Sequence, residues 1–153
     1  MNEKIRILLV DDEEQFVKNM ARILKVRGFA VSTAFSGYDA VDAVKSESAF
    51  DVVLLDIKMP GLDGIETLRE IKTCAPHTEV IMLTGHATAE SAVEGLKSGA
   101  ADYLMKPTHI DELIQKAQEA YEKRQRLEEK IRVLQMRTLS GSPRHIIRES
   151  EES

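Results

Sequence analysis

A chain of 153 residues is long enough for one domain with a substantial buried core. Hydrophobic residues make up 42% of the chain and charged residues 31%, which is typical of a globular protein, and the net charge of −5 argues against a general nucleic-acid binder. The single cysteine, Cys74, excludes an intramolecular disulfide and favours a reducing compartment. The first apolar run is too short for a signal-peptide core or a membrane span, so we expect a cytoplasmic protein without membrane contact.

Five short apolar runs alternate with segments of helical periodicity. The runs are residues 5–10, 29–34, 52–55, 80–83 and 101–105. Nearly continuous apolar runs indicate strands that are covered on both faces. Helices are predicted between them, with Gly28 at the end of the first and Asp63 as the N-cap of the third. This order predicts an α/β fold, a five-stranded parallel sheet in a doubly wound, flavodoxin-like (βα)5 sandwich.

Four of the five runs lead directly into a residue that can handle a phosphoryl group. These residues are Asp11 with Asp12, Asp56, Thr84 and Lys106. The carboxyl ends of parallel strands meet at one edge of the sheet, and ligands of open α/β sheets bind there. Each residue alone could instead be a helix cap, a turn residue or a solvated side chain. Their shared position at four strand ends favours one site.

Two adjacent carboxylates and a third from another strand raise one another's pKa unless a cation joins them. A hard divalent ion such as Mg²⁺ prefers a few carboxylates, water and a substrate phosphate. Asp56 follows the most apolar strand, and an aspartate can form an aspartyl-phosphate intermediate. We therefore expect a magnesium-assisted phosphoryl-transfer site, in which Lys106 and Thr84 contact the transferring group.

The chain changes character after Pro107. Residues 111–139 are predicted to form one long helix, and its apolar seam advances in alternating steps of four and three. The seam, with Arg124 as a polar interruption, consists of Leu113, Ala117, Ala120, Arg124, Leu127, Ile131, Leu134 and Thr138. A solvated extension is one reading of the distal part, and a homodimeric coiled coil is the other. We expect the first domain over residues 1–120, a helical extension over 121–139 and a disordered tail over 140–153.

Four sequence segments together resemble the receiver domain of two-component response regulators, over about residues 4–120. The segments are Leu9-Val10-Asp11-Asp12-Glu13, the run from Leu54 to Gly64 (LLDIKMPGLDG), Met82-Leu83-Thr84-Gly85 and Asp102-Tyr103-Leu104-Met105-Lys106-Pro107. The distal helix resembles linkers in enhancer-binding activators of this family, which join receivers to ATPase domains.

The resemblance implies a role for each of these positions. Asp56 accepts phosphate from the phosphohistidine of a sensor histidine kinase or a phosphotransfer protein. Asp11, Asp12, Asp56 and the backbone carbonyl of Lys58 arrange Mg²⁺, while Thr84 and Lys106 hold the phosphoryl group. Tyr103 is the implied switch aromatic, which turns inward when Thr84 moves toward the phosphate. Lys58 and His86 occupy positions that tune the rate of dephosphorylation.

Three functions remain open on these residues. The first is a phosphorylation-driven signalling switch, with self-catalysed phosphotransfer and autodephosphorylation only, which acts by changing a protein-interaction surface. The second is the N-terminal receiver of a larger transcriptional activator. The third is a phosphatase with an aspartyl nucleophile on a similar sandwich. No recognition helix or basic patch follows residue 110, so direct binding to nucleic acid is not expected.

Overall fold

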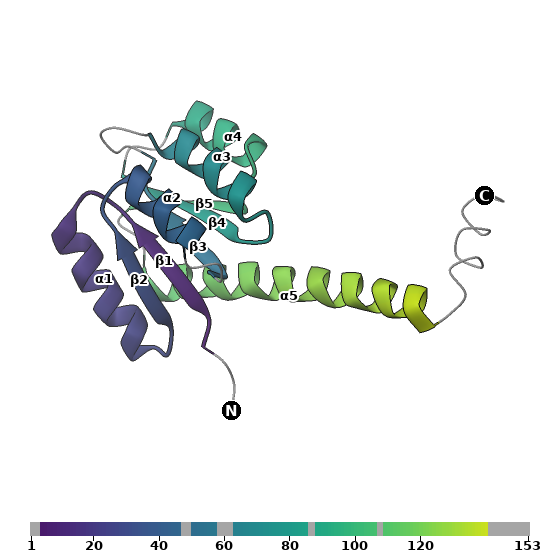
Figure 1. The fold of residues 1–153 in the computed structure, drawn as a ribbon. Coiled ribbons are helices and arrows are strands. Elements are labelled where there is room, and N and C mark those ends of the chain that lie inside the picture. The colour runs from purple at the N-terminus through teal and green to yellow at the C-terminus, as the bar shows by residue number, and fades with distance from the viewer. Residues whose placement is uncertain (1–3, 47–49, 58–62, 86–87, 107–108, 141–153) are drawn as a thin grey trace. The chain divides into compact units, whose positions relative to one another are not determined.

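A computed structural model of the chain describes residues 4–46, 50–57, 63–85, 88–106 and 109–140. Strands and helices alternate among the described residues between Arg6 and Ser140, as the sequence predicts (Figure 1). The strands are β1 (Arg6–Val10), β2 (Ala30–Ala34), β3 (Val52–Leu55), β4 (Glu79–Thr84) and β5 (Asp102–Met105). The helices are α1 (Glu14–Val26), α2 (Gly37–Ser46), α3 (Gly64–Cys74), α4 (Ala89–Lys97) and α5 (Ile110–Ser140).

The five strands form one parallel sheet in the order β2-β1-β3-β4-β5. The chain moves from β1 to one side to make β2 and then crosses to the other side to make β3. The strand order therefore reverses at β1, and the carboxyl ends of β1 and β3 flank the point of reversal. This sheet confirms the predicted flavodoxin-like sandwich and places the crevice where ligands of such sheets bind.

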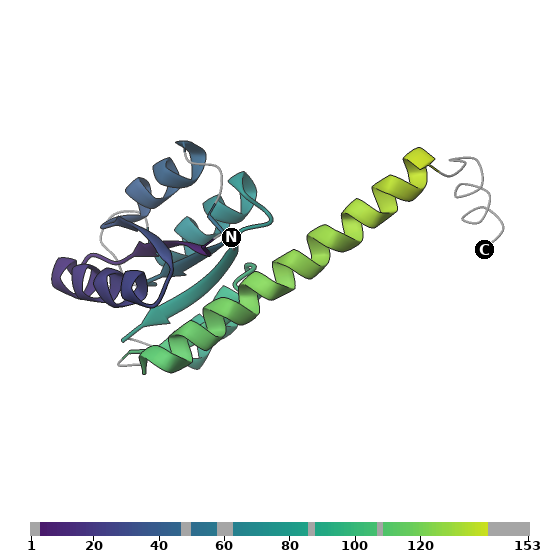
Figure 2. The same ribbon diagram turned by 90° about the horizontal axis from the view of Figure 1, so that it is seen from below.

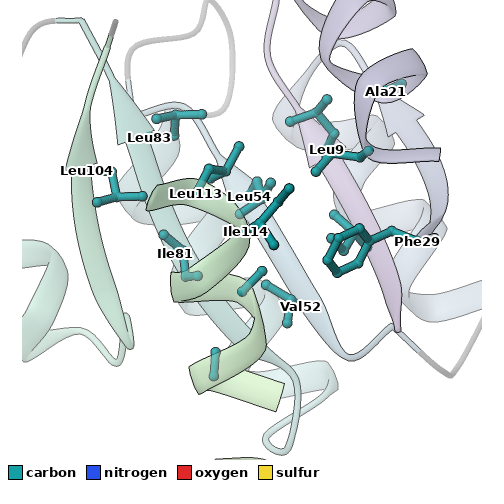
Figure 3. Close-up of a cluster of buried hydrophobic side chains, with 14 of the residues drawn as sticks. Leu9, Ala21, Phe29, Val52, Leu54, Ile81, Leu83, Leu104, Leu113 and Ile114 are labelled. Atoms are coloured by element: carbon teal, nitrogen blue, oxygen red, sulfur yellow. The ribbon is translucent and has the colours of Figure 1, made fainter. Parts of the chain in front are cut away.

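Alternation of side chains along the strands divides the buried core between the two faces of the sheet. Ile7 and Leu9 of β1 point into a cluster with α1 and α5, whereas Leu8 and Val10 point into a cluster with α2 and α3. Figure 3 shows the first cluster, in which Leu113 from α5 lies among strand side chains. Both faces are covered, which explains why the central strands are continuously apolar.

Contacts divide the chain into two compact units, Met1–Tyr121 and Glu122–Ser153, and α5 contributes residues to both (Figure 2). In the first unit, Leu113, Ala117 and Ala120 are buried in the core of the sandwich. In the second unit, the apolar side chains of Leu127 and Leu134 are exposed. Residues 141–153, most of the expected tail, lie outside the described part of the chain.

Two local features fix the ends of the helices that surround the crevice. Asp63 caps α3 through a 2.9 Å hydrogen bond that its carboxylate accepts from the Glu66 amide, as predicted. Gly28 follows α1 with a φ of 98°, a conformation that glycine adopts without strain.

Among the described residues, no helix combines the length and apolar character needed to cross a membrane.

Candidate functional site

Asp11 and Asp56 lie at neighbouring strand ends because β1 and β3 are paired in the sheet. The amide of Asp56 donates a 3.0 Å hydrogen bond to the carbonyl of Val10, and the amide of Asp11 donates a 3.2 Å hydrogen bond to the carbonyl of Ala34. The backbone of both aspartates is thus held by continuations of the sheet ladder.

Gly64 brings the start of α3 against the residues that follow β3. Its amide donates a 2.8 Å hydrogen bond to the carbonyl of Ile57. A Cβ at this position would lie 2.7 Å from the carbonyl oxygen of Asp56 and closer still to Ile57. Only glycine permits this approach, so Gly64 helps to fix the backbone of Asp56.

Three carboxylates meet at the crevice. Asp11, Asp12 and Asp56 each offer an oxygen, and these oxygens lie within 4.8 Å of one another. Asp11 is 2% exposed and Asp56 is 6% exposed, whereas Asp12 faces solvent. Buried carboxylates at this separation repel one another unless a cation compensates their charge. The donor set consists of hard carboxylate oxygens, one of them on an exposed side chain, and this fits Mg²⁺.

Lys106 supplies a cation at the same edge of the sheet. Its ammonium donates a hydrogen bond to Asp11, lies 3.5 Å from a carboxylate oxygen of Glu13, and sits 4.2 Å from the centre of the Phe16 ring. Burial favours a lower pKa for Lys106, but the hydrogen bond to Asp11 and the charges of Asp11, Asp56 and Glu13 outweigh it and raise the pKa above its ordinary value. Lys106 is therefore charged at neutral pH.

Thr84 is the last residue of β4 and is fully buried. Its carbonyl accepts a 2.8 Å hydrogen bond from the amide of Lys106, which follows β5. This bond continues the ladder between β4 and β5 and keeps the two residues side by side. The predicted convergence of strand ends thus brings Thr84 and Lys106 to the edge that carries the acidic cluster.

Tyr103 lies on β5 and is partly buried. Its hydroxyl is 3.4 Å from the hydroxyl oxygen of Ser91 in α4. Ser91 also belongs to the capping box of α4, where it exchanges hydrogen bonds with Thr88 at 3.0 and 3.1 Å. Tyr103 is therefore linked to the N-terminal turn of α4.

The structure brings the predicted acidic cluster, Thr84 and Lys106 to one edge of the sheet, and it adds contacts that the sequence did not predict. Lys58 and His86 lie outside the described residues. Ser91 was missed because its partner Tyr103 is distant in sequence and nothing local marks the contact. The pairing of Lys106 with Asp11 and Glu13 was also missed, although the acidic residues that follow the first strand were a signal for a cationic partner.

Comparison with known proteins gives a consistent result. The response regulator receiver domain family matches residues 7–118. Transcriptional regulatory protein ZraR of Klebsiella oxytoca is 44% identical over 111 residues, which are 72% of this chain and 25% of ZraR. The receiver domain of NtrX from Brucella abortus is 39% identical, with a TM-score of 0.71 over 76% of this chain and 98% of that structure.

A third relative was solved with a modified site. It is a response regulator protein from Burkholderia pseudomallei with a phosphorylated aspartic acid, a calcium ion and citrate. It is 28% identical, with a TM-score of 0.72 over 82% of this chain and 73% of that structure.

The chain spans about a quarter of the length of ZraR and of the C4-dicarboxylate transport transcriptional regulatory protein DctD of Rhizobium meliloti. The matches cover the sheet, its helices and every strand end of the crevice. They favour a signalling switch over the phosphatase that shares this sandwich. By sequence, by fold and by the arrangement of its strand ends, the chain belongs to the response regulator receiver domain family.

Proposed function

We propose that Asp56 accepts a phosphoryl group from the phosphohistidine of a sensor histidine kinase or a phosphotransfer protein. Receiver domains in general interact with such partners. The observation that carries the assignment is the position of Asp56, a buried carboxylate at the strand reversal beside Asp11 and Lys106. The phosphorylated aspartic acid of the Burkholderia pseudomallei relative supports the same chemistry.

In the proposed transfer, a carboxylate oxygen of Asp56 forms a bond to phosphorus while the bond from phosphorus to the donor imidazole nitrogen breaks. The electron pair returns to the imidazole, which takes up a proton from solvent. The Lys106 ammonium and the Thr84 hydroxyl then contact the negatively charged phosphoryl oxygens. Lys106 would exchange its hydrogen bond with Asp11 for contact with the phosphoryl group, and its charge already interacts with that of Asp56.

Receiver domains generally bind Mg²⁺ at an acidic pocket. We propose that Asp11, Asp12 and Asp56 hold the ion here, together with the carbonyl of Lys58, which lies outside the described residues. When bound, Mg²⁺ neutralises carboxylate and phosphoryl charge and favours in-line transfer. Two of the three carboxylates, those of Asp11 and Asp56, are buried, and backbone hydrogen bonds to the sheet hold both residues at their strand ends.

Removal of Mg²⁺ tests this proposal. We expect the chain to gain the mass of one phosphoryl group when it is incubated with a small phosphodonor and Mg²⁺, and to stay unmodified when EDTA is present. Without the ion, the repulsion between the acidic cluster and the incoming phosphate is uncompensated. Intact-protein mass spectrometry measures the result. Equal modification with and without EDTA would contradict the metal assignment.

We also propose that phosphorylation changes the surface around α4 through Tyr103. In the structure, the Tyr103 hydroxyl contacts Ser91 at the start of α4. Movement of Thr84 toward the phosphate would open space for the Tyr103 ring, which would then leave Ser91. The two positions of the ring form a two-state element that a phosphate biases.

Replacement of Ser91 with Ala is expected to favour the inward position of Tyr103, because it removes a partner of the outward one. A hydrogen bond contributes about 1 kcal/mol, so affinity for beryllofluoride with Mg²⁺ is expected to rise by no more than roughly fivefold. Tyr103→Phe should give a similar rise, and the double variant no further rise, since both remove one contact. Additive effects would rule out the proposed coupling. Calorimetric titration measures all four affinities.

The proposed output is control of transcription, because the relatives ZraR and DctD are named as transcriptional regulators. We place the chain in the cytoplasm, where it signals by protein contact and not by direct binding to nucleic acid. Lys58 and His86 remain candidates for setting the lifetime of the phosphoryl group. Specific binding of a promoter fragment by this chain alone, in a mobility-shift assay, would contradict the proposed mode of output.

A further inference from the structure

Phe16 is an aromatic residue at the crevice that the proposed phosphoryl transfer does not use. It lies in the first turn of α1 and packs, partly buried, against the core cluster that α1 and α5 share. The ammonium of Lys106 lies 4.2 Å from the centre of its ring. A cation within about 6 Å of a ring centre is attracted to the negative face of the ring. Phe16 is thus a partner of Lys106 that carries neither a charge nor an oxygen.

The contact forms where solvent contributes little to the stability of the ammonium. The side chain of Lys106 is 13% exposed, and burial disfavours a charged group. Glu13, whose carboxylate lies 3.5 Å from the ammonium, is 69% exposed, so solvent screens its charge. The face of Phe16 therefore stabilises the ammonium in the position where it donates its hydrogen bond to Asp11.

This position of Lys106 opposes metal binding by the acidic cluster. Both carboxylate oxygens of Asp11 already accept a hydrogen bond, Oδ1 from the amide of Glu13 at 3.0 Å and Oδ2 from the Lys106 ammonium. Asp11 is also one of the three carboxylates that we assign to Mg²⁺. A divalent cation at Asp11 repels the ammonium, so the two compete for this carboxylate.

We propose that Phe16 is a positioning residue that holds Lys106 against Asp11 and thereby raises the Mg²⁺ concentration needed to fill the site. The inference rests on the proposed role of Asp11 as a metal ligand. The contact with the ring belongs to the state without metal, and it is lost when Lys106 leaves Asp11 for the phosphoryl group. Phe16 therefore opposes activation without touching either the metal or the phosphoryl group.

The role of Phe16 in the core can be separated from its role toward Lys106. A leucine at this position would keep an apolar contact with the cluster, but it has no negative face to offer a cation. A tyrosine would keep the ring. Phe35 is a matched control, because it is also partly buried against the same cluster.

Titration of the whole chain with Mg²⁺ tests the inference, with backbone amide signals followed by NMR. Phe16→Leu is expected to raise the affinity for Mg²⁺ by roughly twofold to tenfold, the range that corresponds to a cation–π contact. Phe16→Tyr and Phe35→Leu should bind Mg²⁺ as the wild type does. An equal change in Phe16→Leu and Phe16→Tyr would assign the effect to packing and overturn the inference.

A double variant shows whether Phe16 acts through Lys106. Lys106→Met removes the competing charge and should itself raise the affinity for Mg²⁺. In that background Phe16→Leu should give no further rise, because the ring has no ammonium to hold. A rise of the same size in both backgrounds would overturn the inference.

Failure of the inference and failure of the proposed metal site are distinguishable. A wild-type chain that binds Mg²⁺ with the same affinity as Phe16→Leu would overturn the inference and leave the metal site standing. A wild-type chain that does not bind Mg²⁺ would overturn both.

The contact itself is measured in the absence of metal. Protons above the face of an aromatic ring are shifted upfield, so we expect the ε-methylene signal of Lys106, identified by its loss in Lys106→Met, to lie upfield of other lysine signals. Phe16→Leu should abolish this shift, and saturation with Mg²⁺ should move the wild-type signal back toward the ordinary lysine position. A signal that stays upfield at saturation would show that Lys106 keeps the ring contact when the metal is bound, and this would overturn the inference.

Discussion

Replacement of Asp56 with Asn is expected to abolish phosphorylation by a small phosphodonor in the presence of Mg²⁺. The asparagine side chain keeps the size of aspartate, and the hydrogen bond from the backbone amide of residue 56 to Val10 is unaffected, but the charged carboxylate that we propose as the nucleophile is lost. The loss should be complete and not partial, because the proposed acceptor is the carboxylate whose position is set by the end of β3. Intact-protein mass spectrometry after incubation with the donor measures it.

Asp51 provides a matched control at the opposite end of the same strand. Its carboxylate accepts a 2.8 Å hydrogen bond from the amide of Arg6, far from the crevice along β3. Asp51→Asn is expected to leave labelling unchanged, since it makes the same chemical change away from the site. Undiminished labelling of Asp56→Asn would remove Asp56 as the acceptor. Loss of labelling in both variants would instead indicate a general failure of folding, which circular dichroism would detect.

Replacement of Gly64 with Ala is expected to destabilise the domain by about 1–3 kcal/mol, although alanine is the better helix former. The new Cβ would lie 2.7 Å from the carbonyl oxygen of Asp56 and would also clash with the backbone of Ile57. Neither neighbour is a flexible side chain, so α3 must move away from the end of β3. Urea denaturation followed by circular dichroism measures the change.

The Gly64→Ala variant should be phosphorylated more slowly than the wild type, because the displaced backbone carries the proposed acceptor, Asp56. Gly85→Ala is the control, since a Cβ there would meet nothing closer than Lys106 Cβ at 3.9 Å. We expect its free energy of unfolding to stay within about 0.5 kcal/mol of the wild-type value. If Gly64→Ala proved as stable as Gly85→Ala, the result would contradict the claim that only glycine at position 64 permits α3 to approach Asp56.

The sequence predicted the sheet and the convergence of its strand ends because both follow from periodicity. Buried parallel strands must be apolar on both faces, and β1 and β3 are. Once the strands alternate with helices, their carboxyl ends share an edge whatever the residues between them. Asp56 and Lys106 could therefore be assigned to one site although 50 positions separate them.

The contacts made within that site could not be predicted in the same way. Which anion Lys106 meets first depends on the path of its side chain across Phe16. The link from Tyr103 to Ser91 depends on how α4 packs on the sheet, where Gly95 allows close approach to Met82. The local sequence carries no signal for the partner of Lys106 or for the contact between Tyr103 and Ser91.

The long helix illustrates a different limit. Its heptad spacing is constant along the sequence, but the structure uses Leu113 as a core residue and leaves Leu127 exposed. Periodicity defines the face of a helix without stating what covers that face. The division at Tyr121 depends on where the sandwich ends, which is a property of the tertiary structure.

The most direct test of the account is to locate the phosphoryl group in the chain. The wild-type protein would be phosphorylated with a small phosphodonor and Mg²⁺, reduced with borohydride to convert an acyl phosphate into a stable alcohol, digested, and sequenced by tandem mass spectrometry. We predict a homoserine at position 56 and unmodified aspartates at positions 11, 12 and 51. Reduction at any other residue, with Asp56 intact, would contradict the assignment of this site.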